Sequence, residues 1–160
     1  MCGIIGIASN KPVSINIINS LKKLEYRGYD SAGIATLKNN FINEKKCSGR
    51  VEELEKILFK SPSDGNIGIG HVRWATHGVP SILNAHPHSS ENVSVVHNGI
   101  IENSDELKKE LESKGLKFKS QTDTEVITLL ITEALNNNEP LESVLSLIHI
   151  SEPTRPDYIA

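Results

Sequence analysis

The sequence predicts one α+β domain, and three observations lead to this expectation. The 160 residues, of which 38% are hydrophobic, have the size and composition of one globular domain with a substantial core. Short apolar segments with strand character occur beside amphipathic segments with helical periodicity. Strand–helix–strand alternation is rare along the chain, which favours an α+β fold over a doubly wound parallel sheet.

Five segments have the apolar or alternating pattern of strands. The first is rich in isoleucine, and the fourth alternates apolar residues with glycine. Asn39 and Asn40 are typical turn residues, so the second and third strands should form a hairpin. Asn98 and Gly99 end the fifth. The expected strands cover residues 3–9, 33–37, 41–47, 67–72 and 93–97.

Four segments have helical character, and three of them begin with a capping residue. Ser14 can N-cap the first helix, which should present one apolar face to the core. Asn103 with Glu106, and Thr122 with Glu125, have the spacing of a capping box. The expected helices cover residues 14–25, 51–59, 103–114 and 122–135, and the apolar face of the first consists of Ile15, Ile18, Leu21 and Leu24.

The composition excludes several classes of partner. The chain has 17 basic and 20 acidic residues, which gives a net charge of −3. This balance does not favour a positively charged surface for binding nucleic acid. Aromatic residues make up 4%, too few for a platform on which bases stack. The apolar stretches are much shorter than a membrane span. The lack of a signal peptide and the presence of only two cysteines indicate a cytoplasmic protein with free thiols.

Cys2 is the first candidate catalytic residue. Removal of Met1, which is usual before a small residue, would make Cys2 the amino terminus. Its thiol, with a pKa of about 8.5, would then lie beside an α-amine of pKa about 7.7–8. The amine can accept the thiol proton and later protonate a leaving group, so that one residue serves as nucleophile and base. A cysteine near the start by chance is the alternative. Cys47, in a strand pattern, is expected to be a small core residue.

The turn at His97-Asn98-Gly99 is the second candidate. An acyl-transfer nucleophile needs hydrogen-bond donors where negative charge develops on the carbonyl oxygen. The Asn98 side-chain amide and the Gly99 N–H can supply two donors from one turn. An ordinary Asn-Gly hairpin turn is the alternative interpretation.

Arg73 and Asp123 suggest a site for an α-amino acid. The planar guanidinium of Arg73 matches a carboxylate, and the Asp123 carboxylate can pair with an ammonium group. A surface salt bridge for Arg73 and stabilisation of a helix N-terminus by Asp123 remain alternatives. The residues that follow Arg73 add polar donors and the single tryptophan, which can cover a small pocket: Trp74, Thr76 and His77.

Five of the six histidines lie between His71 and His97, which raises the possibility of metal binding. Their spacing matches no standard ligand pattern, and no cysteine or glutamate completes a zinc-type set among them. The sequence also contains no glycine-rich phosphate loop. We therefore expect neither a metal nor a cofactor.

Taken together, these segments resemble the class II glutamine amidotransferases, a family with an N-terminal cysteine nucleophile. The resemblance extends over about residues 1–144, and its most specific motifs lie at residues 1–6, 24–33, 73–78, 86–88 and 97–103. It implies a four-layer αββα sandwich of the N-terminal nucleophile (Ntn) hydrolase type. The fold should be incomplete, with an unpaired sheet edge, because the family's domain continues beyond this length.

The resemblance also implies residue roles. Cys2 would attack the side-chain amide of glutamine, with Asn98 and Gly99 holding the oxyanion. Arg73 would bind the glutamine α-carboxylate and Asp123 its α-amine. Structural roles near the site are expected for Arg27 and His71. Further residues implied at the glutamine site are Trp74, Ala75, Thr76, His77 and His86.

The products would be glutamate and ammonia, and the ammonia would pass to a downstream module that acts on fructose 6-phosphate in a homodimeric parent enzyme. Residues 1–144 are then a partial glutaminase domain. Residues 145–160 resemble the translation of a transposon-end sequencing adapter and are expected to be a non-native tail, the alternative being a natural strand and loop. The fragment by itself is expected to have weak glutaminase activity or none.

Three other interpretations remain. An amidohydrolase of the same fold could act on a different amide, although an Arg73–Asp123 pair is needed only for an amino-acid substrate. A histidine-rich binding module would take up metal stoichiometrically and leave Cys2 unreactive. A gene fragment that does not fold would show no regular secondary structure and would aggregate.

Overall fold

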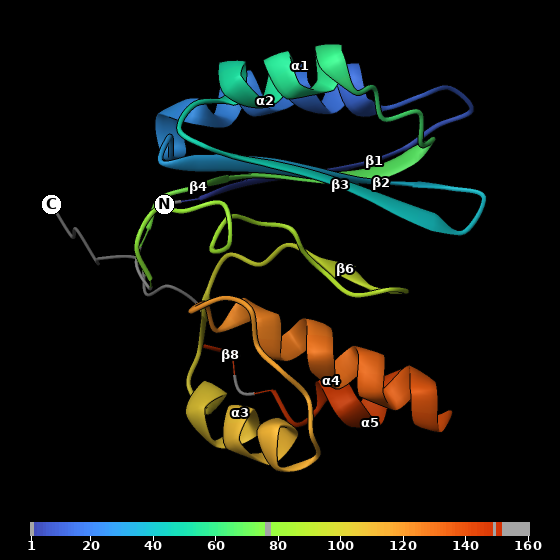
Figure 1. Cartoon of the computed structure of the whole chain (residues 1–160), viewed down its shortest axis with the longest axis vertical. Coiled ribbons are helices and arrows are strands. Elements are labelled where there is room, and N and C mark those ends of the chain that lie inside the picture. The colour runs from blue at the N-terminus through green and yellow to red at the C-terminus, as the bar shows by residue number, and fades with distance from the viewer. Residues whose placement is uncertain (1, 76–77, 149, 152–160) are drawn as a thin grey trace, which may run out of the picture.

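The computed structural model describes residues 2–75, 78–148 and 150–151, which form an α+β sandwich (Figure 1). Helices α1 (Ser14–Leu24) and α2 (Val51–Lys60) form one outer layer and cover a four-stranded sheet. Short strands follow on the other face of the sheet, and beyond them lie α3 (Ser104–Ser113), α4 (Thr124–Asn137) and α5 (Leu141–Leu145). The expected α+β class is confirmed.

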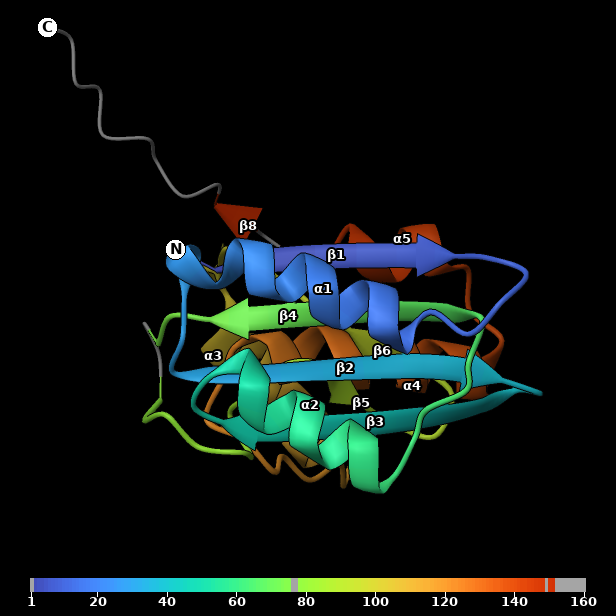
Figure 2. The same ribbon diagram turned by 90° about the horizontal axis from the view of Figure 1, so that it is seen from above.

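The main sheet has the strand order β1-β4-β2-β3 and is antiparallel throughout (Figure 2). Its strands are β1 (Gly3–Ala8), β2 (Ser31–Lys38), β3 (Phe41–Ser48) and β4 (Ile67–Arg73). Asn39 and Asn40 have φ values of 50° and 65°, which is the geometry of a tight type I′ hairpin turn. The hairpin expected at this turn is confirmed.

The second β layer is much smaller than the first. In the part of the chain that the structure describes, it consists of two-residue strands paired in two ladders, β5 with β6 and β7 with β8. The described strands of this second layer are β5 (His88–Ser89), β6 (Ser94–Val95), β7 (Ile100–Ile101) and β8 (Ile150–Ser151). The strand expected at residues 93–97 is shorter than predicted, because only the two residues of β6 pair there.

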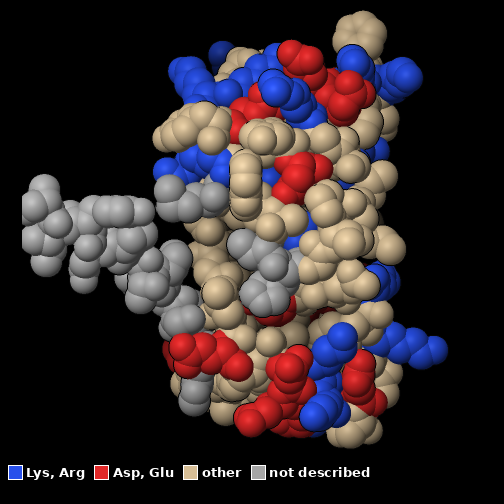
Figure 3. Space-filling model, turned by 90° about the vertical axis from the view of Figure 1, so that its left-hand side faces the viewer, with Lys and Arg blue, Asp and Glu red and all other residues tan. Residues whose placement is uncertain are grey.

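Two apolar cores correspond to the two sides of the sandwich. The first lies between the main sheet and helices α1 and α2, and includes Ile17, Leu21, Ile34, Leu54 and Val72. The second lies among α3, α4, α5 and β7, and includes Ile101, Leu107, Leu111, Val126, Leu130 and Val144. Lys, Arg, Asp and Glu side chains gather over the two outer helical layers in a side view, and the band between them is mostly uncharged (Figure 3).

The apolar face of α1 differs from the prediction. Ile18 and Leu21 are buried as expected, but Ile15 is 73% exposed and Ile17 takes its place in the core. Ser14 is the first helical residue, and Val13 occupies the capping position without a side-chain hydrogen bond. The sheet below decides which stripe of the helix is buried, because Ile17 and Leu21 both pack over it.

The two predicted capping boxes do not form. Asn103 precedes α3, but its side-chain amide donates to the Leu147 carbonyl oxygen at 2.9 Å. The Thr122 hydroxyl makes a 2.8 Å hydrogen bond with His88, and the Glu125 carboxylate accepts backbone N–H groups of the preceding loop. Both helices exist where predicted, but tertiary partners take the capping side chains.

The last described residues contact the rest of the molecule. Ile148 packs against the second core, and β8 pairs with β7. Among the described residues, no helix has the length and apolarity required to cross a bilayer.

Candidate active site around Cys2

Cys2 lies at one end of the main sheet, directly before β1. In the β1–β4 ladder Gly3 is opposite Val72, so Cys2 and Arg73 lie at the same end of these two neighbouring strands. The Cys2 side chain is half-buried, and the Trp74 backbone N–H donates to its sulfur at 3.5 Å. The thiol is therefore held against the loop that leaves β4.

Two further segments meet at the Cys2 backbone. The Arg27 Nε donates to the Cys2 carbonyl oxygen at 3.0 Å, from the short 3₁₀ helix that follows α1. The Asn98 side-chain amide donates to the same oxygen at 3.5 Å, from the turn between β6 and β7. Asn98 is exposed, so its amide is open to a ligand beside Cys2. Both layers of the sandwich thus contribute to the surroundings of the cysteine, and Gly99 follows Asn98 in the same turn.

Asp30 holds the loop that covers Cys2. Its backbone N–H donates to the Arg73 carbonyl oxygen at 3.2 Å, and its carboxylate accepts the Ala75 N–H and, at 2.9 Å, the Ser31 hydroxyl. Gly28 allows this approach, because a Cβ there would lie 2.6 Å from the carbonyl carbon and oxygen of Arg73. Asp30 was not among the residues predicted for the site. Its position between a glycine-containing loop and a strand was the available signal.

Trp74 stands at the surface beside the thiol. Its side chain is 46% exposed, and its ring meets the Tyr29 ring edge to face with centroids 5.4 Å apart. The Arg50 guanidinium lies 5.7 Å from the centre of the Tyr29 ring. An exposed indole in this position can cover a ligand at Cys2, as the sequence suggested.

Arg73 is almost completely enclosed, with 4% of its surface exposed. Its Nη2 donates to the Gly78 carbonyl oxygen at 3.3 Å, and this contact spans the loop between the two residues. Gly78 has a φ of 74°, a conformation that favours glycine. Thr76 and His77, both expected at the site, lie outside the described residues.

Asp123 occupies the capping position of α4, and its Oδ2 accepts the Ile101 N–H at 2.9 Å. This bond connects the start of α4 to β7, just after the Asn98-Gly99 turn. The structure therefore places Asp123 close to the Asn98-Gly99 turn, in the layer opposite Arg73.

Three buried histidines lie between the layers. The His71 and His86 rings meet edge to face with a hydrogen bond of 3.1 Å between Nε2 and Nδ1, and the His86 and His88 ring centroids are 4.8 Å apart. Sequence analysis placed His86 near glutamine. The structure shows its ring held between two other imidazoles.

Burial keeps these imidazoles neutral. It lowers the pKa of His71 to about 3, with the nearby Arg73 acting in the same direction. Burial, followed by the Lys46 and Arg73 charges, lowers the pKa of His88 to about 3. The pKa of His86 also falls well below its usual range, chiefly through burial. Burial lowers the pKa of His97 against the opposing effect of Asp123.

No group of three or more His, Cys, Asp or Glu side chains is arranged to hold a metal ion in the described part of the chain. The two cysteines also differ in environment. Cys47 is buried on the helical side of the sheet, and burial raises the pKa of its thiol, as expected of a core residue. Cys2 is the half-buried thiol at the loop end of the sheet.

The fold and the site define a class of protein. Residues 71–146 match the glutamine amidotransferase domain family. The fold is similar to that of glutamine phosphoribosylpyrophosphate amidotransferase from B. subtilis, with a TM-score of 0.78 and 28% identity over 94% of this chain and 33% of that one. The chain is therefore similar, in sequence over residues 71–146 and in fold over most of its length, to glutamine amidotransferases of the Ntn type.

In sequence, the chain is similar to one kind of enzyme of this class. It is 52% identical over 145 residues to the glutamine–fructose-6-phosphate aminotransferase (isomerizing) of Bradyrhizobium diazoefficiens, which is 90% of this chain and 24% of that protein. It is 55% identical over 150 residues to the same enzyme of Clostridium acetobutylicum, which is 92% of this chain and 24% of that protein. The chain thus spans about a quarter of the length of these relatives.

Proposed function

We propose that this chain is the glutamine-hydrolysing part of a glutamine–fructose-6-phosphate aminotransferase. Cys2 acts as nucleophile on the side-chain amide of glutamine, giving glutamate and ammonia. The observation that supports this most strongly is a pair of contacts at Cys2. The Trp74 N–H donates to its sulfur, and the Asn98 side-chain amide donates to its carbonyl oxygen at 3.5 Å, so a half-buried thiol and an exposed amide donor lie close together.

The reaction begins once Met1 has been removed. The α-amine of Cys2 takes the thiol proton, and the thiolate attacks the amide carbon of glutamine. The carbonyl electron pair moves to oxygen, and the resulting oxyanion accepts hydrogen bonds from the Asn98 amide and the Gly99 N–H. A donor of this kind is worth about 3 kcal/mol of transition-state stabilisation.

Collapse of this intermediate releases ammonia. The carbon–nitrogen bond breaks as the α-ammonium of Cys2 gives its proton to the leaving nitrogen, and a γ-glutamyl thioester remains on sulfur. Water then adds to the thioester carbonyl with the amine as base. Cleavage of the carbon–sulfur bond frees glutamate and returns the thiol.

The two charged ends of glutamine are assigned to Arg73 and Asp123. The Arg73 guanidinium receives the α-carboxylate, and the Asp123 carboxylate receives the α-ammonium. In the structure Arg73 ends β4 of the main sheet, and Asp123 stands at the start of α4 in the other layer. The remaining residues of the glutamine pocket in this proposal are Trp74, Ala75, Thr76, His77 and His86.

The wider protein follows from the relatives. In the full enzyme, ammonia would aminate fructose 6-phosphate in domains outside this chain and form glucosamine 6-phosphate, the start of amino-sugar synthesis. We assign residues 1–144 to the glutaminase domain and residues 145–160 to a non-native tail. The parent enzyme is proposed to be cytoplasmic and homodimeric.

The test uses an electrophilic glutamine analogue, such as a diazoketone, on the purified chain. Intact mass spectrometry and peptide mapping should find loss of Met1 and one adduct on Cys2, and excess glutamine should suppress the adduct. Cys47 is a matched internal control, since it is buried and should stay unmodified. Equal labelling of both cysteines, or labelling that glutamine does not slow, would show that no glutamine site exists around Cys2.

A further inference from the structure

We propose that His71, His86 and His88, together with Thr122, form a strut that sets the position of Asp123 relative to Arg73. These four are positioning residues, because they act through the two charged groups. The inference rests on the proposed function, in which Arg73 and Asp123 bind the two ends of one glutamine. Of the four, only His86 already has a place in the proposed glutamine pocket, and the inference gives all four a role in positioning.

The strut begins on the main sheet. His71 lies on β4, two residues before Arg73, and its side chain is completely buried on the face opposite α1 and α2. Its Nε2 lies 3.1 Å from the Nδ1 of His86. Because His71 and Arg73 share one strand, their positions are linked through its backbone.

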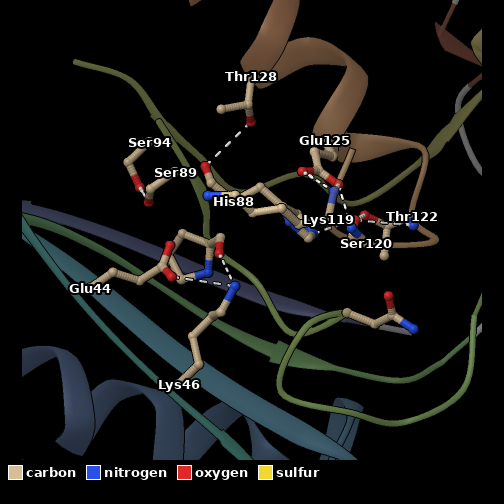
Figure 4. A network of polar contacts seen from close by, with 12 residues as sticks. Glu44, Lys46, His88, Ser89, Ser94, Lys119, Ser120, Thr122, Glu125 and Thr128 are labelled. Carbon is tan, nitrogen blue, oxygen red and sulfur yellow. Dashed lines mark hydrogen bonds and ion pairs between the residues drawn. The ribbon is translucent and has the colours of Figure 1, made fainter. Parts of the chain in front are cut away.

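The middle of the strut is seated on the neighbouring strands. A Cβ at Gly33 of β2 would lie 2.1 Å from the His86 carbonyl oxygen, so the absence of a side chain brings this loop against the sheet. The Lys46 ammonium on β3 donates to the Pro87 carbonyl oxygen at 3.1 Å and lies 3.3 Å from Glu44 (Figure 4). The loop is therefore held against the first layer at the His86 and Pro87 carbonyl groups.

The far end reaches the second layer. The His88 ring meets that of His86 edge to face, and its Nε2 makes a 2.8 Å hydrogen bond with the Thr122 hydroxyl (Figure 4). Both side chains are buried. Thr122 directly precedes Asp123, so this hydrogen bond fixes the backbone immediately before the carboxylate.

A cross-layer connection of this kind has a specific consequence for glutamine. The separation of the α-carboxylate and α-ammonium groups is fixed by covalent geometry, and Arg73 and Asp123 must match it from different layers. The ladders of the second layer are only two residues long, so strand pairing alone gives it little stiffness. A displacement of about 1 Å in a binding group can cost about a hundredfold in rate.

The experiment removes the Thr122 hydroxyl group, at the end of the strut. Thr122→Val removes the hydroxyl at nearly constant volume, and Thr122→Ser restores it. Thr132→Val is the matched control, because its hydroxyl also connects α4 to the loop beyond β5, donating to Ser90 at 2.7 Å. Each variant is labelled at Cys2 by the diazoketone analogue over a range of concentrations, to separate the inhibition constant from the limiting rate.

The strut predicts that Thr122→Val raises the inhibition constant five- to tenfold, as expected for about 1 kcal/mol from one hydrogen bond, and leaves the limiting rate unchanged. Thr122→Ser and Thr132→Val should both behave like the wild type. An unchanged inhibition constant in Thr122→Val, or an equal rise in Thr132→Val, would overturn the strut.

A second readout does not depend on glutamine. The Ile101 N–H donates to Asp123, so its hydrogen exchange reports the position of that carboxylate. It should speed up in Thr122→Val and stay unchanged in Thr132→Val. If the wild type is not labelled, the proposed function fails, and the exchange result still decides whether the strut positions Asp123: equal protection in all variants would reject it.

Discussion

Acid should destabilise this protein in a range where its carboxylates are still ionised. His71, His86 and His88 are neutral in the folded state, because burial holds their pKa values far below the ordinary value of 6.5. The charged groups that act on them from neighbouring elements are cationic, namely Arg73 on β4 and Lys46 on β3. As pH falls through 6.5, the unfolded chain binds protons at these positions and the folded chain does not, so the free energy of unfolding falls.

The size of the effect follows from the number of protons. Each proton bound only by the unfolded chain lowers the free energy of unfolding by about 1.4 kcal/mol per pH unit. Three histidines therefore give a slope of about 4 kcal/mol per unit between pH 6 and 5. The contribution of His71 and His88 to this slope should fade as the pH falls through about 3, where both become protonated in the folded state as well. Because domains are commonly stable by about 5–15 kcal/mol, unfolding is expected well above that pH.

The assay is urea unfolding at pH 7, 6, 5.5 and 5, roughly above the range in which exposed carboxylates titrate. His88→Gln removes one of the three protons and should reduce the slope by about a third, whatever its effect on stability at pH 7. A wild-type slope below about 1.4 kcal/mol per unit would mean that fewer than one proton is taken up. That result would refute the assignment of a neutral, buried histidine group.

Three further predictions concern the site and the tail. Gly28→Ala places a Cβ 2.6 Å from the Arg73 carbonyl group, so it should lower the free energy of unfolding in urea by about 1–3 kcal/mol and slow Cys2 labelling. Gly6→Ala is the control and should change neither quantity, because its Cβ would meet only Ile69, at 4.0 Å. Arg73→Lys should raise the inhibition constant of a glutamine analogue about tenfold or more, because a lysine cannot pair in a bidentate manner, and an unchanged constant would remove Arg73 from the carboxylate role. Deletion of residues 145–160, the segment assigned to the non-native tail, should leave glutamine-protected labelling intact, and loss of labelling would make these residues part of the domain.

The main sheet and its helices could be predicted because their signals are local. The isoleucine-rich first strand, the Asn39-Asn40 turn and the helix at Val51–Lys60 all follow from short-range patterns, and all are found. The second layer was less predictable. Its strands are only two residues long, and such short pairings carry almost no periodic signal.

Side-chain partners were the least predictable part. Thr122 and Glu125 have the spacing of a capping box, but the Thr122 hydroxyl bonds His88, which lies 34 positions earlier in the chain. In the same way, Cys2 and Asn98 were separate weak candidates, and only the fold brings them within 3.5 Å of one another. Asp30 was missed because its effect depends on the loop after β4, which is distant in sequence.

The most direct test of the central claim is to detect the covalent intermediate. The chain is mixed with glutamine, quenched in acid within the first turnovers and measured by intact mass spectrometry, then digested to locate the added mass. The account predicts a γ-glutamyl group, the mass of glutamine less ammonia, on Cys2 of the chain that has lost Met1, and none on Cys47. Release of glutamate and ammonia by the folded chain, with the same yield from Cys2→Ala, would contradict it.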